Sequence, residues 1–323
     1  MKKNNSLHVA VIGVGNMGKN HLRAYSQIPF AKLVAVSDVN KQLGETLANK
    51  YHAKYYSDYK EMIKQEKIDA LSICVPTSLH FVVASYCIAK KINILLEKPI
   101  ATTLEEAKKI LQLASKNRIS LLVGHIERFN PAVKKVKELI KKGDLGKITA
   151  ITARRVGGFP PQIKDANIAV DLAIHDIDIV NYLLDEIPQS ITVNKQKNHI
   201  TKREDSVEFF LKFKRASAYI QANWISPVKI RKLTITGSEG YLEMDYITQK
   251  IEFFKSNYNK FKQASKNYSD YILLFSEPDI INISVAKKEP LTEELTYFLE
   301  SIHKKEKINS KFAQEALKIA LFE

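Results

Sequence analysis

The sequence predicts an α/β fold class: an amino-terminal Rossmann domain with a doubly wound parallel sheet, then an α+β carboxy-terminal domain with an open mixed, largely antiparallel sheet. Three observations predict it. A glycine-rich turn joins an apolar strand to a helix within residues 7–28, strand and helix patterns then alternate as far as residue 125, and longer strand patterns dominate after residue 147. A chain of 323 residues is long enough for two cores, so we expect domains at 1–125 and 126–323.

The first element is the apolar strand Val9–Ile12, which runs directly into Gly13-x-Gly15-x-x-Gly18 and a helix-compatible segment. In such an arrangement the first glycine makes the turn, the second lets backbone N–H groups approach a pyrophosphate, and the third lets the helix pack closely on the strand. The helix N-terminus then faces the phosphates with its partial positive charge. The residues that we expect around the cofactor phosphates are Gly13, Gly15, Asn16, Met17 and Gly18.

The second strand, Leu33–Ser37, ends in Asp38, 20 residues after Gly18. About 20 residues is the spacing of the acidic side chain that binds the ribose hydroxyls in dinucleotide-binding domains. A carboxylate at that place repels a 2′-phosphate, so NAD is the expected cofactor rather than NADP. The alternative is a glycine turn without a ligand and an aspartate on the surface.

The elements that follow keep the alternation of a doubly wound sheet. We expect helices at 41–51, 79–91 and 104–118, and a further helix that begins at residue 57 or 58. We expect strands at 53–56, 70–75, 93–96 and 120–124. Pro76 and Thr77 follow one buried strand, and Glu97 and Lys98 follow the next. These four residues therefore lie at the carboxyl ends of parallel strands, where open sheets bind ligands, so we expect all four to contact the cofactor, with Lys98 beside the nicotinamide. Pro99 is a candidate for a cis peptide bond.

Longer strand patterns begin beyond a helix that starts near Pro131. We expect strands at 147–156, 191–193, 206–213, 216–224, 229–236 and 241–245, and closing helices at 292–302 and 313–322. Within residues 218–224 every second residue is apolar, which predicts one sheet face packed on helices. The other face is a candidate subunit interface.

A polar stripe runs along one expected helix of the second domain. Asp171, His175, Asp178 and Tyr182 fall at i, i+4, i+7 and i+11 and thus share one side. Their neighbours are largely apolar, which indicates a buried helix that turns this stripe to a cavity. The alternatives are a solvated helix face or a histidine satisfied by its neighbouring carboxylates. The first three residues can also approach one ion, but without a cysteine or second histidine nearby we expect no metal.

Two further groups of polar residues lie near strand ends. Arg128 and Asn130 follow the last strand of the first domain, and Arg154 and Arg155 lie at the end of the first strand of the second. A guanidinium donates two parallel hydrogen bonds to a phosphate, so these residues are candidates for binding a phosphorylated substrate. The alternative is that a pair of arginines marks a solvated sheet edge.

Charge and cysteine content limit the function classes. The net charge of +15 suggests a nucleic-acid partner, but only eight of the 50 basic residues are arginines and no nucleic-acid-binding motif is present. We therefore expect no nucleic acid and allow for an anionic small substrate. The only cysteines, Cys74 and Cys87, indicate a reduced compartment, and no apolar run reaches the roughly 18 residues of a membrane span. The apolar stretch at the start lacks the features of a secretory signal, so we expect a cytoplasmic protein without a membrane partner.

The motifs together resemble one family. GVGNMG with Asp38, VPTSLH, EKP and the Asp-x-x-x-His helix are similar to motifs of the glucose-fructose oxidoreductase/inositol dehydrogenase (Gfo/Idh/MocA) family, and the resemblance covers nearly the whole chain. It implies a Rossmann domain that binds NAD(P), a substrate site on an open mixed sheet, and a homo-oligomer, either a dimer or a tetramer. It also implies that Lys98 and His175 are the catalytic pair, with Asp171 beside them.

More narrowly, GHIERFNPAV, RRVGGFPP and DLAIHDIDIVNYLL are similar to UDP-N-acetylglucosamine 3-dehydrogenases of that family. This implies NAD-dependent oxidation of C3 of a UDP-linked N-acetylhexosamine to a ketone, with Arg128, Asn130, Arg154 and Arg155 at the UDP end. The 3-keto sugar would pass to an aminotransferase in lipid A or glycan biosynthesis. Gly158 stands where this group is expected to have a proline. Two alternatives stay open: a dehydrogenase of a free sugar, inositol or sugar acid, and a non-catalytic NAD-binding regulator.

Overall fold

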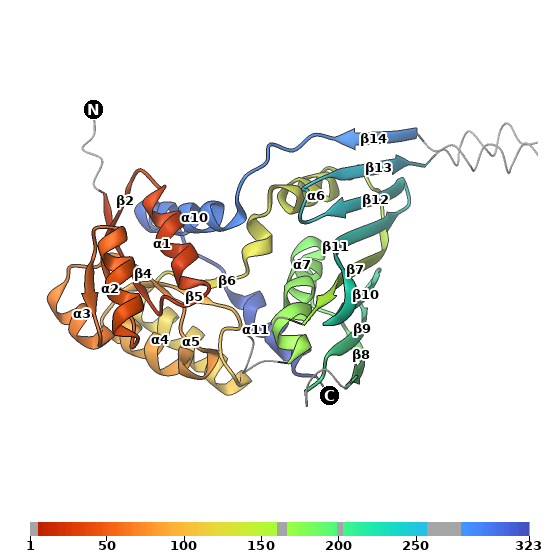
Figure 1. Ribbon diagram of the computed structural model, residues 1–323. Coiled ribbons are helices and arrows are strands. Elements are labelled where there is room, and N and C mark those ends of the chain that lie inside the picture. The colour runs from red at the N-terminus through yellow and green to blue at the C-terminus, as the bar shows by residue number, and fades with distance from the viewer. Residues whose placement is uncertain (1–5, 160–166, 199–202, 257–278, 323) are drawn as a thin grey trace, which may run out of the picture. The chain divides into compact units, whose positions relative to one another are not determined.

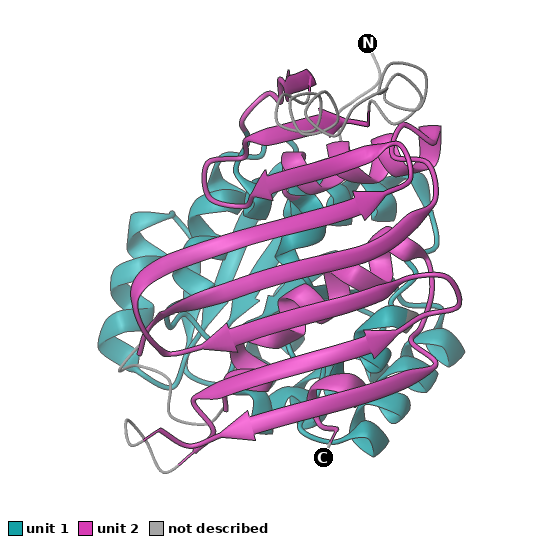
Figure 2. Cartoon of the chain, turned by 90° about the vertical axis from the view of Figure 1, so that its right-hand side faces the viewer, with its two compact units in different colours: residues 1–129, 288–318 teal, residues 130–287, 319–323 magenta. Residues whose placement is uncertain are grey.

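The computed structural model describes residues 6–159, 167–198, 203–256 and 279–322. Residues 1–5 and residues 160–166, which begin two positions after Gly158, lie outside the described residues. The chain forms two compact units: unit 1 comprises residues 1–129 and 288–318, and unit 2 comprises residues 130–287 and 319–323 (Figure 2). The predicted domain boundary after residue 125 assigns residues 288–318 to the second domain. In the structure these residues belong to unit 1, which contains the amino terminus. In the described part of the chain, no helix is long and apolar enough to cross a bilayer.

Unit 1 is built on a six-stranded parallel sheet with the order β3-β2-β1-β4-β5-β6, as the Rossmann prediction requires (Figure 1). Its strands are β1 (Leu7–Ile12), β2 (Ala31–Ser37), β3 (Lys54–Tyr56), β4 (Ala70–Ile73), β5 (Asn93–Glu97) and β6 (Leu121–Gly124). The chain adds β2 and β3 on one side of β1 and then returns to place β4 on the other side. The carboxyl ends of β1 and β4 therefore flank a topological switch point, where open parallel sheets bind their ligands.

Helices cover both faces of this sheet. They are α1 (Gly18–Ser26), α2 (Lys41–Lys50), α3 (Tyr59–Gln65), η1 (Thr77–Leu79), α4 (His80–Ala89), α5 (Leu104–Asn117), η2 (Ile126–Phe129), α10 (Pro290–Lys304) and α11 (Lys311–Ala320). One buried cluster joins the sheet to α3, α4, α5 and α11, with Met62 and Leu317 among its members. A second joins it to α1, α2 and α10, with Leu22 and Phe298 among its members. The late segment 288–318 belongs to unit 1 because it adds apolar side chains to both clusters.

Unit 2 is built on an eight-stranded sheet with the order β14-β13-β12-β11-β7-β10-β9-β8. Its strands are β7 (Ile148–Gly158), β8 (Ser190–Gln196), β9 (Ser206–Lys212), β10 (Ser217–Asn223), β11 (Ile225–Gly237), β12 (Gly240–Asp245), β13 (Ile251–Lys255) and β14 (Asp279–Ile283). Strands β7 and β10 pair in parallel, and the other described neighbours pair antiparallel. The predicted fold class is therefore confirmed in both of its sheets.

The described helices of unit 2 lie on one face of its sheet, behind the strands in Figure 2. They are α6 (Pro131–Lys142), η3, which is a π-helical turn (Ala169–Ala173), and α7 (Ile174–Leu184). Along β10, Ala218, Ile220 and Ala222 are buried while Tyr219 between them is exposed. The predicted alternation is therefore confirmed, with one face of the sheet packed and the other open.

Candidate active site

The glycine-rich turn between β1 and α1 has no room for side chains at two of its positions. A Cβ atom on Gly18 would lie 1.9 Å from the carbonyl oxygen of Gly13, and one on Gly13 would lie 2.8 Å from the carbonyl oxygen of Cys74. Gly13 also has a φ of +80°, in the left-handed region that favours glycine. A Cβ atom on Gly15 would meet nothing within 4 Å. The turn is thus closed on its inner side and open to a ligand at its middle glycine.

Helix α1 starts in this turn, and its amino-terminal end suits an anion. Within the described residues no side chain caps the helix, and its first turn carries no acidic residue. The first N–H groups of a helix point out of its N-terminus and carry partial positive charge. Asn16 and Met17, which the sequence places at the pyrophosphate, lie in the turn that leads into the helix. The turn and the helix end together form the kind of site that binds a pyrophosphate.

Asp38 follows β2, and two backbone N–H groups hold its carboxylate. Oδ2 accepts a hydrogen bond from the N–H of Val14 at 2.7 Å, and Oδ1 accepts one from the N–H of Asn40 at 2.7 Å. The first bond ties the acid to the glycine-rich turn. Each carboxylate oxygen keeps a second lone pair, so the group can still accept hydrogen bonds from ribose hydroxyls. Its fixed negative charge is unfavourable for a 2′-phosphate.

A buried histidine connects the loops that follow β4 and β5. Pro76 and Thr77 lie in the first loop, and Thr77 begins η1. Nδ1 of His80 lies 2.8 Å from the carbonyl oxygen of Pro99, and Nε2 lies 3.0 Å from that of Val75. Burial lowers the pKa of His80, and a neutral imidazole has one N–H, so it donates to one of the two carbonyls. His80, which no sequence pattern singled out, thus connects the loops that follow β4 and β5.

Glu97 turns its side chain into unit 1. It is 7% exposed; Oε1 lies 2.8 Å from Nε2 of His21, and Oε2 accepts a hydrogen bond from the N–H of Lys98 at 3.2 Å. The peptide bond after Lys98 is cis. His21, Cys74 and Glu97 also offer metal-ligand atoms within 4.8 Å of one another. Because Glu97 and Ser72 engage both nitrogens of His21, and burial raises the pKa of the Cys74 thiol, the arrangement favours a hydrogen-bond network over a cation.

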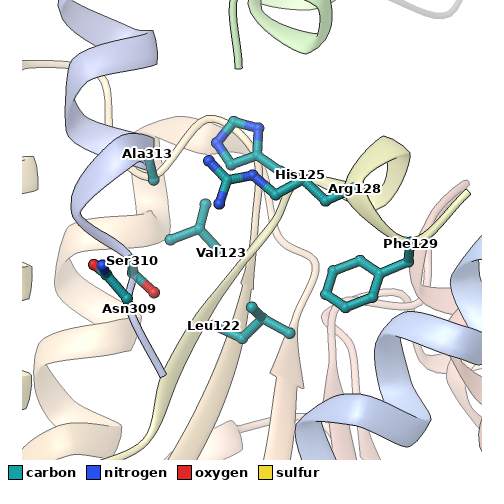
Figure 3. A pocket seen from close by; sticks show the side chains of 8 residues that line it. All are labelled: Leu122, Val123, His125, Arg128, Phe129, Asn309, Ser310 and Ala313. Atoms are coloured by element: carbon teal, nitrogen blue, oxygen red, sulfur yellow. The ribbon is translucent and has the colours of Figure 1, made fainter. Parts of the chain in front are cut away.

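A recess lies at the carboxyl end of β6 (Figure 3). Its volume is about 250 Å³, which includes space open to solvent, and its lining is Leu122, Val123, His125, Arg128, Phe129, Asn309, Ser310 and Ala313. The guanidinium carbon of Arg128 lies 5.5 Å from the centre of the Phe312 ring. The Ser310 hydroxyl donates to the carbonyl oxygen of Leu121 at 2.6 Å. Arg128, predicted from the sequence as a phosphate ligand, thus stands at a recess with several polar groups.

Asn130 caps the first helix of unit 2. It is 1% exposed, its Oδ1 accepts a hydrogen bond from the N–H of Ala132 at 3.1 Å, and its Nδ2 donates to the carbonyl oxygen of Tyr246 at 3.0 Å. The first bond satisfies an N–H at the start of α6, and the second ties the helix to the end of β12. Both ends of this amide therefore serve the packing of unit 2.

The predicted polar stripe spans η3 and α7. Asp171 lies in the π-helical turn, and His175, Asp178 and Tyr182 lie on α7. Asp178 is fully buried, whereas Asp171 and His175 are half-buried with Oδ2 and Nδ1, respectively, shielded from solvent. π-helical turns within helices are frequent at functional sites. The structure therefore places an acid and an imidazole four residues apart on one largely buried helical segment.

Arg154 and Arg155 lie on opposite faces of the sheet. Arg155 is 5% exposed on the helix side, where its Nε and Nη2 donate to Asp176 at 2.6 and 3.0 Å. Arg154 is exposed on the other side, and its Nε donates to Gln221 at 3.2 Å. The structure therefore does not bring the two arginines together, because side chains alternate along a strand. It gives Arg155 a buried carboxylate as its partner.

Two family models match the chain. The model described as "Oxidoreductase family, NAD-binding Rossmann fold" matches residues 7–125, and that of the GFO/IDH/MocA C-terminal domain matches residues 133–243. The chain belongs to the Gfo/Idh/MocA oxidoreductase family. The predicted cofactor, NAD, is the cofactor of this family's Rossmann domain.

Several similar Gfo/Idh/MocA proteins have curated names. The UDP-N-acetylglucosamine 3-dehydrogenase of Acidithiobacillus ferrooxidans is 25% identical over 249 residues, which are 77% of each chain. The uncharacterized oxidoreductase YrbE of Bacillus subtilis is 32% identical over 181 residues, which are 54% of this chain and 52% of that protein. The scyllo-inositol 2-dehydrogenase (NAD(+)) of B. subtilis is 35% identical over 181 residues, 54% of this chain and 53% of that one. The chain thus spans about half the length of the two Bacillus proteins.

The fold of this Gfo/Idh/MocA chain is found in solved structures. The structure of the A. ferrooxidans UDP-N-acetylglucosamine 3-dehydrogenase superposes on this chain with a TM-score of 0.84 at 23% sequence identity. The superposition covers 98% of this chain and 95% of the A. ferrooxidans chain. The site in unit 1 fits NAD on its own geometry. The turn excludes side chains at two glycines and leaves Gly15 open, and the Asp38 carboxylate is fixed beside it. Residues 13–18 would hold the pyrophosphate and Asp38 the ribose.

Proposed function

We propose that this Gfo/Idh/MocA chain is an NAD-dependent dehydrogenase of a sugar secondary hydroxyl, and that its substrate is UDP-N-acetylglucosamine, oxidised at C3. The observation that carries the proposal is that Asp171 and His175 lie four residues apart on one largely buried helical segment, each with a side-chain polar atom shielded from solvent. An imidazole with an acidic neighbour is a suitable acid and base for a hydroxyl group. The likeness to the A. ferrooxidans enzyme, which spans 77% of both chains, supports a nucleotide sugar.

Each catalytic side chain has a distinct task in this proposal. His175 accepts the proton of the hydroxyl group, because imidazole titrates near working pH and serves as both base and acid. Asp171, one helical turn earlier, orients the imidazole. Lys98 stabilises the developing alkoxide with its positive charge. When bound, NAD⁺ is the two-electron oxidant for this chemistry.

The residues proposed for the UDP end contribute in different ways. Arg128 is assigned to the diphosphate, since it stands at the recess beside β6. Arg155 and Asn130 act through packing, the first by holding α7 through Asp176 and the second by capping α6. Arg154 lies on the exposed sheet face and contacts substrate only if a second subunit completes the site there.

A substrate panel tests this proposal. NADH formation is measured with UDP-N-acetylglucosamine and UDP-N-acetylgalactosamine, and with free N-acetylglucosamine, myo-inositol and sugar acids. We expect turnover of the UDP-sugars only. The free-polyol alternative has its own support, because the myo-inositol 2-dehydrogenase of Thermotoga maritima is 29% identical over 187 residues. Activity confined to the free polyols would replace our substrate.

Two variants test whether the chain is an enzyme rather than an NAD-binding regulator. Lys98→Met and His175→Ala should each lower kcat by a factor of about 100 or more while the protein still folds and binds NAD⁺. Lys108→Met, at an exposed position of α5, is the matched control and should behave like the wild type. Normal turnover by the first two variants would show that our site assignment is wrong.

We further propose a homo-oligomer, a dimer or tetramer, formed through the open face of the eight-stranded sheet. Phe210 and Tyr219 lie directly opposite each other on β9 and β10 and are 49% and 37% exposed. Exposed aromatic side chains on a sheet face are typical of a protein interface. Phe210→Glu should lower the mass measured by light scattering, and an unchanged mass would exclude this face. An aminotransferase that consumes the 3-keto sugar is the proposed pathway partner.

A further inference from the structure

A continuous buried chain of hydrogen bonds runs from α1 to Lys98. The hydroxyl oxygen of Ser72 lies 2.8 Å from that of Tyr25 and 3.0 Å from Nδ1 of His21. Nε2 of His21 lies 2.8 Å from Oε1 of Glu97, whose Oε2 accepts the N–H of Lys98 at 3.2 Å. The first three residues have no exposed surface, and Glu97 is 7% exposed. His21 is 51 residues from Ser72 and 76 from Glu97, so only the folded unit assembles this chain.

The charge of the Glu97 carboxylate fixes the direction of the bonds that it makes. Burial alone would raise the pKa of Glu97, but the hydrogen bond and charge of His21, together with the charge of Lys98, outweigh it and hold the pKa below its usual value. Glu97 is therefore an acceptor at both oxygens: Nε2 of His21 donates to one and the N–H of Lys98 to the other. Burial raises the pKa of Tyr25, so its phenol is neutral and shares a hydrogen bond with the Ser72 hydroxyl at the other end of the network. Buried polar groups that are linked in this way hold one another in place.

This network connects the helix that faces the cofactor phosphates with the catalytic lysine. His21 lies three residues after Gly18, in the first turn of α1, and Glu97 is the last residue of β5. Strand β6 confines the carboxylate from another side, because a Cβ atom on Gly124 would lie 3.1 Å from Oε2 of Glu97. Glu97 therefore has little freedom to move away from the N–H of Lys98.

We propose that Glu97 and His21 are positioning residues, which fix the backbone of Lys98 relative to α1 and thereby aim the lysine at the reacting carbon. This role differs from the direct cofactor contact that the sequence predicts for Glu97. It rests on the proposed catalytic function of Lys98. A displacement of about 1 Å in a catalytic group lowers turnover by a factor of about 100. Binding of NAD⁺ and of substrate depends on other residues, so kcat and KM should respond differently.

Hydrogen exchange at the Lys98 amide tests the proposal without any substrate. In Glu97→Met both bonds of the carboxylate are lost, and this amide should exchange about tenfold faster or more, while amides elsewhere in β5 keep their protection. Glu97→Gln keeps one acceptor oxygen and should show a smaller increase in the exchange rate of the Lys98 amide. This variant replaces Glu97→Met in the test if the methionine variant does not fold. Tyr25→Phe, at the end of the hydrogen-bond network that is farthest from Lys98, is the matched control and should leave the exchange of the Lys98 amide unchanged. Wild-type exchange at Lys98 in both Glu97 variants would overturn the proposal.

Kinetics supply the second measurement. Glu97→Met and His21→Phe should lower kcat by a factor of about 10 to 100, with the KM values for NAD⁺ and substrate changed by a factor of about two or less. If these residues were only structural, kcat would fall in proportion to the fraction of unfolded protein. That result would refute the positioning role. If the UDP-sugar is not the substrate, the exchange measurement still gives its result. A failure of the proposed function is therefore distinguishable from a failure of this inference.

Discussion

Removing the carboxylate of Asp176 should destabilise unit 2 strongly. Its partner Arg155 makes two hydrogen bonds to it, at 2.6 and 3.0 Å, and the two side chains are 0% and 6% exposed. The guanidinium carbon of Arg155 also lies 4.9 Å from the centre of the Tyr246 ring. In Asp176→Asn the guanidinium remains in this dry place beside an uncharged amide. The variant therefore retains the cost of burying the charge and loses its compensation.

The size of the effect follows from burial. Breaking a buried pair by removing one partner costs about 3–5 kcal/mol of unfolding free energy. The pair of Lys135 and Glu138 on α6 of the same unit is the matched control, because its side chains are 32% and 59% exposed. Such an i,i+3 pair on a helix surface contributes about 0.2–0.5 kcal/mol, so Glu138→Gln should cost roughly a tenth as much.

Urea unfolding followed by tryptophan fluorescence measures these values. Trp224 is the only tryptophan of the chain, is 1% exposed and belongs to unit 2, so its emission follows the unit that contains the ion pair. With an m-value of about 2.5 kcal/mol/M, a loss of about 4 kcal/mol lowers the midpoint by roughly 1.5 M. The double variant Arg155→Met with Asp176→Leu buries no charge and should lie within about 2 kcal/mol of the wild type. If Asp176→Asn shifts the midpoint no more than Glu138→Gln, our account of this pair is wrong.

Three further predictions concern the cofactor site. Asp38→Ala should raise the KM for NAD⁺ about tenfold and allow turnover with NADP⁺, and an unchanged ratio of kcat/KM for the two cofactors would contradict this. Gly15→Ala should melt like the wild type and bind NAD⁺ about tenfold more weakly by calorimetry, whereas Gly18→Ala should melt at a lower temperature because its Cβ would lie 1.9 Å from a carbonyl oxygen. Burial lowers the pKa of His80 from 6.5, so below that pH the unfolded chain takes up a proton that the folded one does not, and stability falls. His80→Asn should flatten the loss of unfolding free energy between about pH 7 and pH 5, and an unaltered slope would argue against this linkage.

The features that sequence reasoning predicted well depend on local spacing. The glycine turn, Asp38 and the strands between them are set by residues within one strand-helix-strand unit, whose geometry is the same in every doubly wound sheet. The carboxyl ends of parallel strands also lie at one edge of a sheet, which is why Thr77 and Lys98 could be placed in neighbouring loops. Period-two alternation along a strand also predicts that Arg154 and Arg155 point to opposite faces, although their adjacency in the sequence suggests one phosphate-binding group.

The features that it missed depend on contacts between distant residues. Residues 292–302 predict an amphipathic helix, but such a pattern says which side is buried and not which sheet buries it, so the return of this segment to unit 1 could not be read from it. Similarly, His21 in a helix is an ordinary polar residue until β4 and β5 bring Ser72 and Glu97 beside it. The π-helical turn at Asp171 has no sequence signal that distinguishes it from a regular helix.

Helix α7 shows how one element combines packing with chemistry. Asp176 anchors it to Arg155 on β7, and Nζ of Lys137 on α6 donates to the carbonyl oxygens of Tyr182 and Leu183 at 2.6 and 3.0 Å. These bonds hold the helix through a side chain that faces the sheet and through two of its last carbonyls. It follows that substitutions at Asp176 should affect stability and activity together. Those at His175 should affect activity more than stability, because Asp176 and Lys137 already anchor the helix.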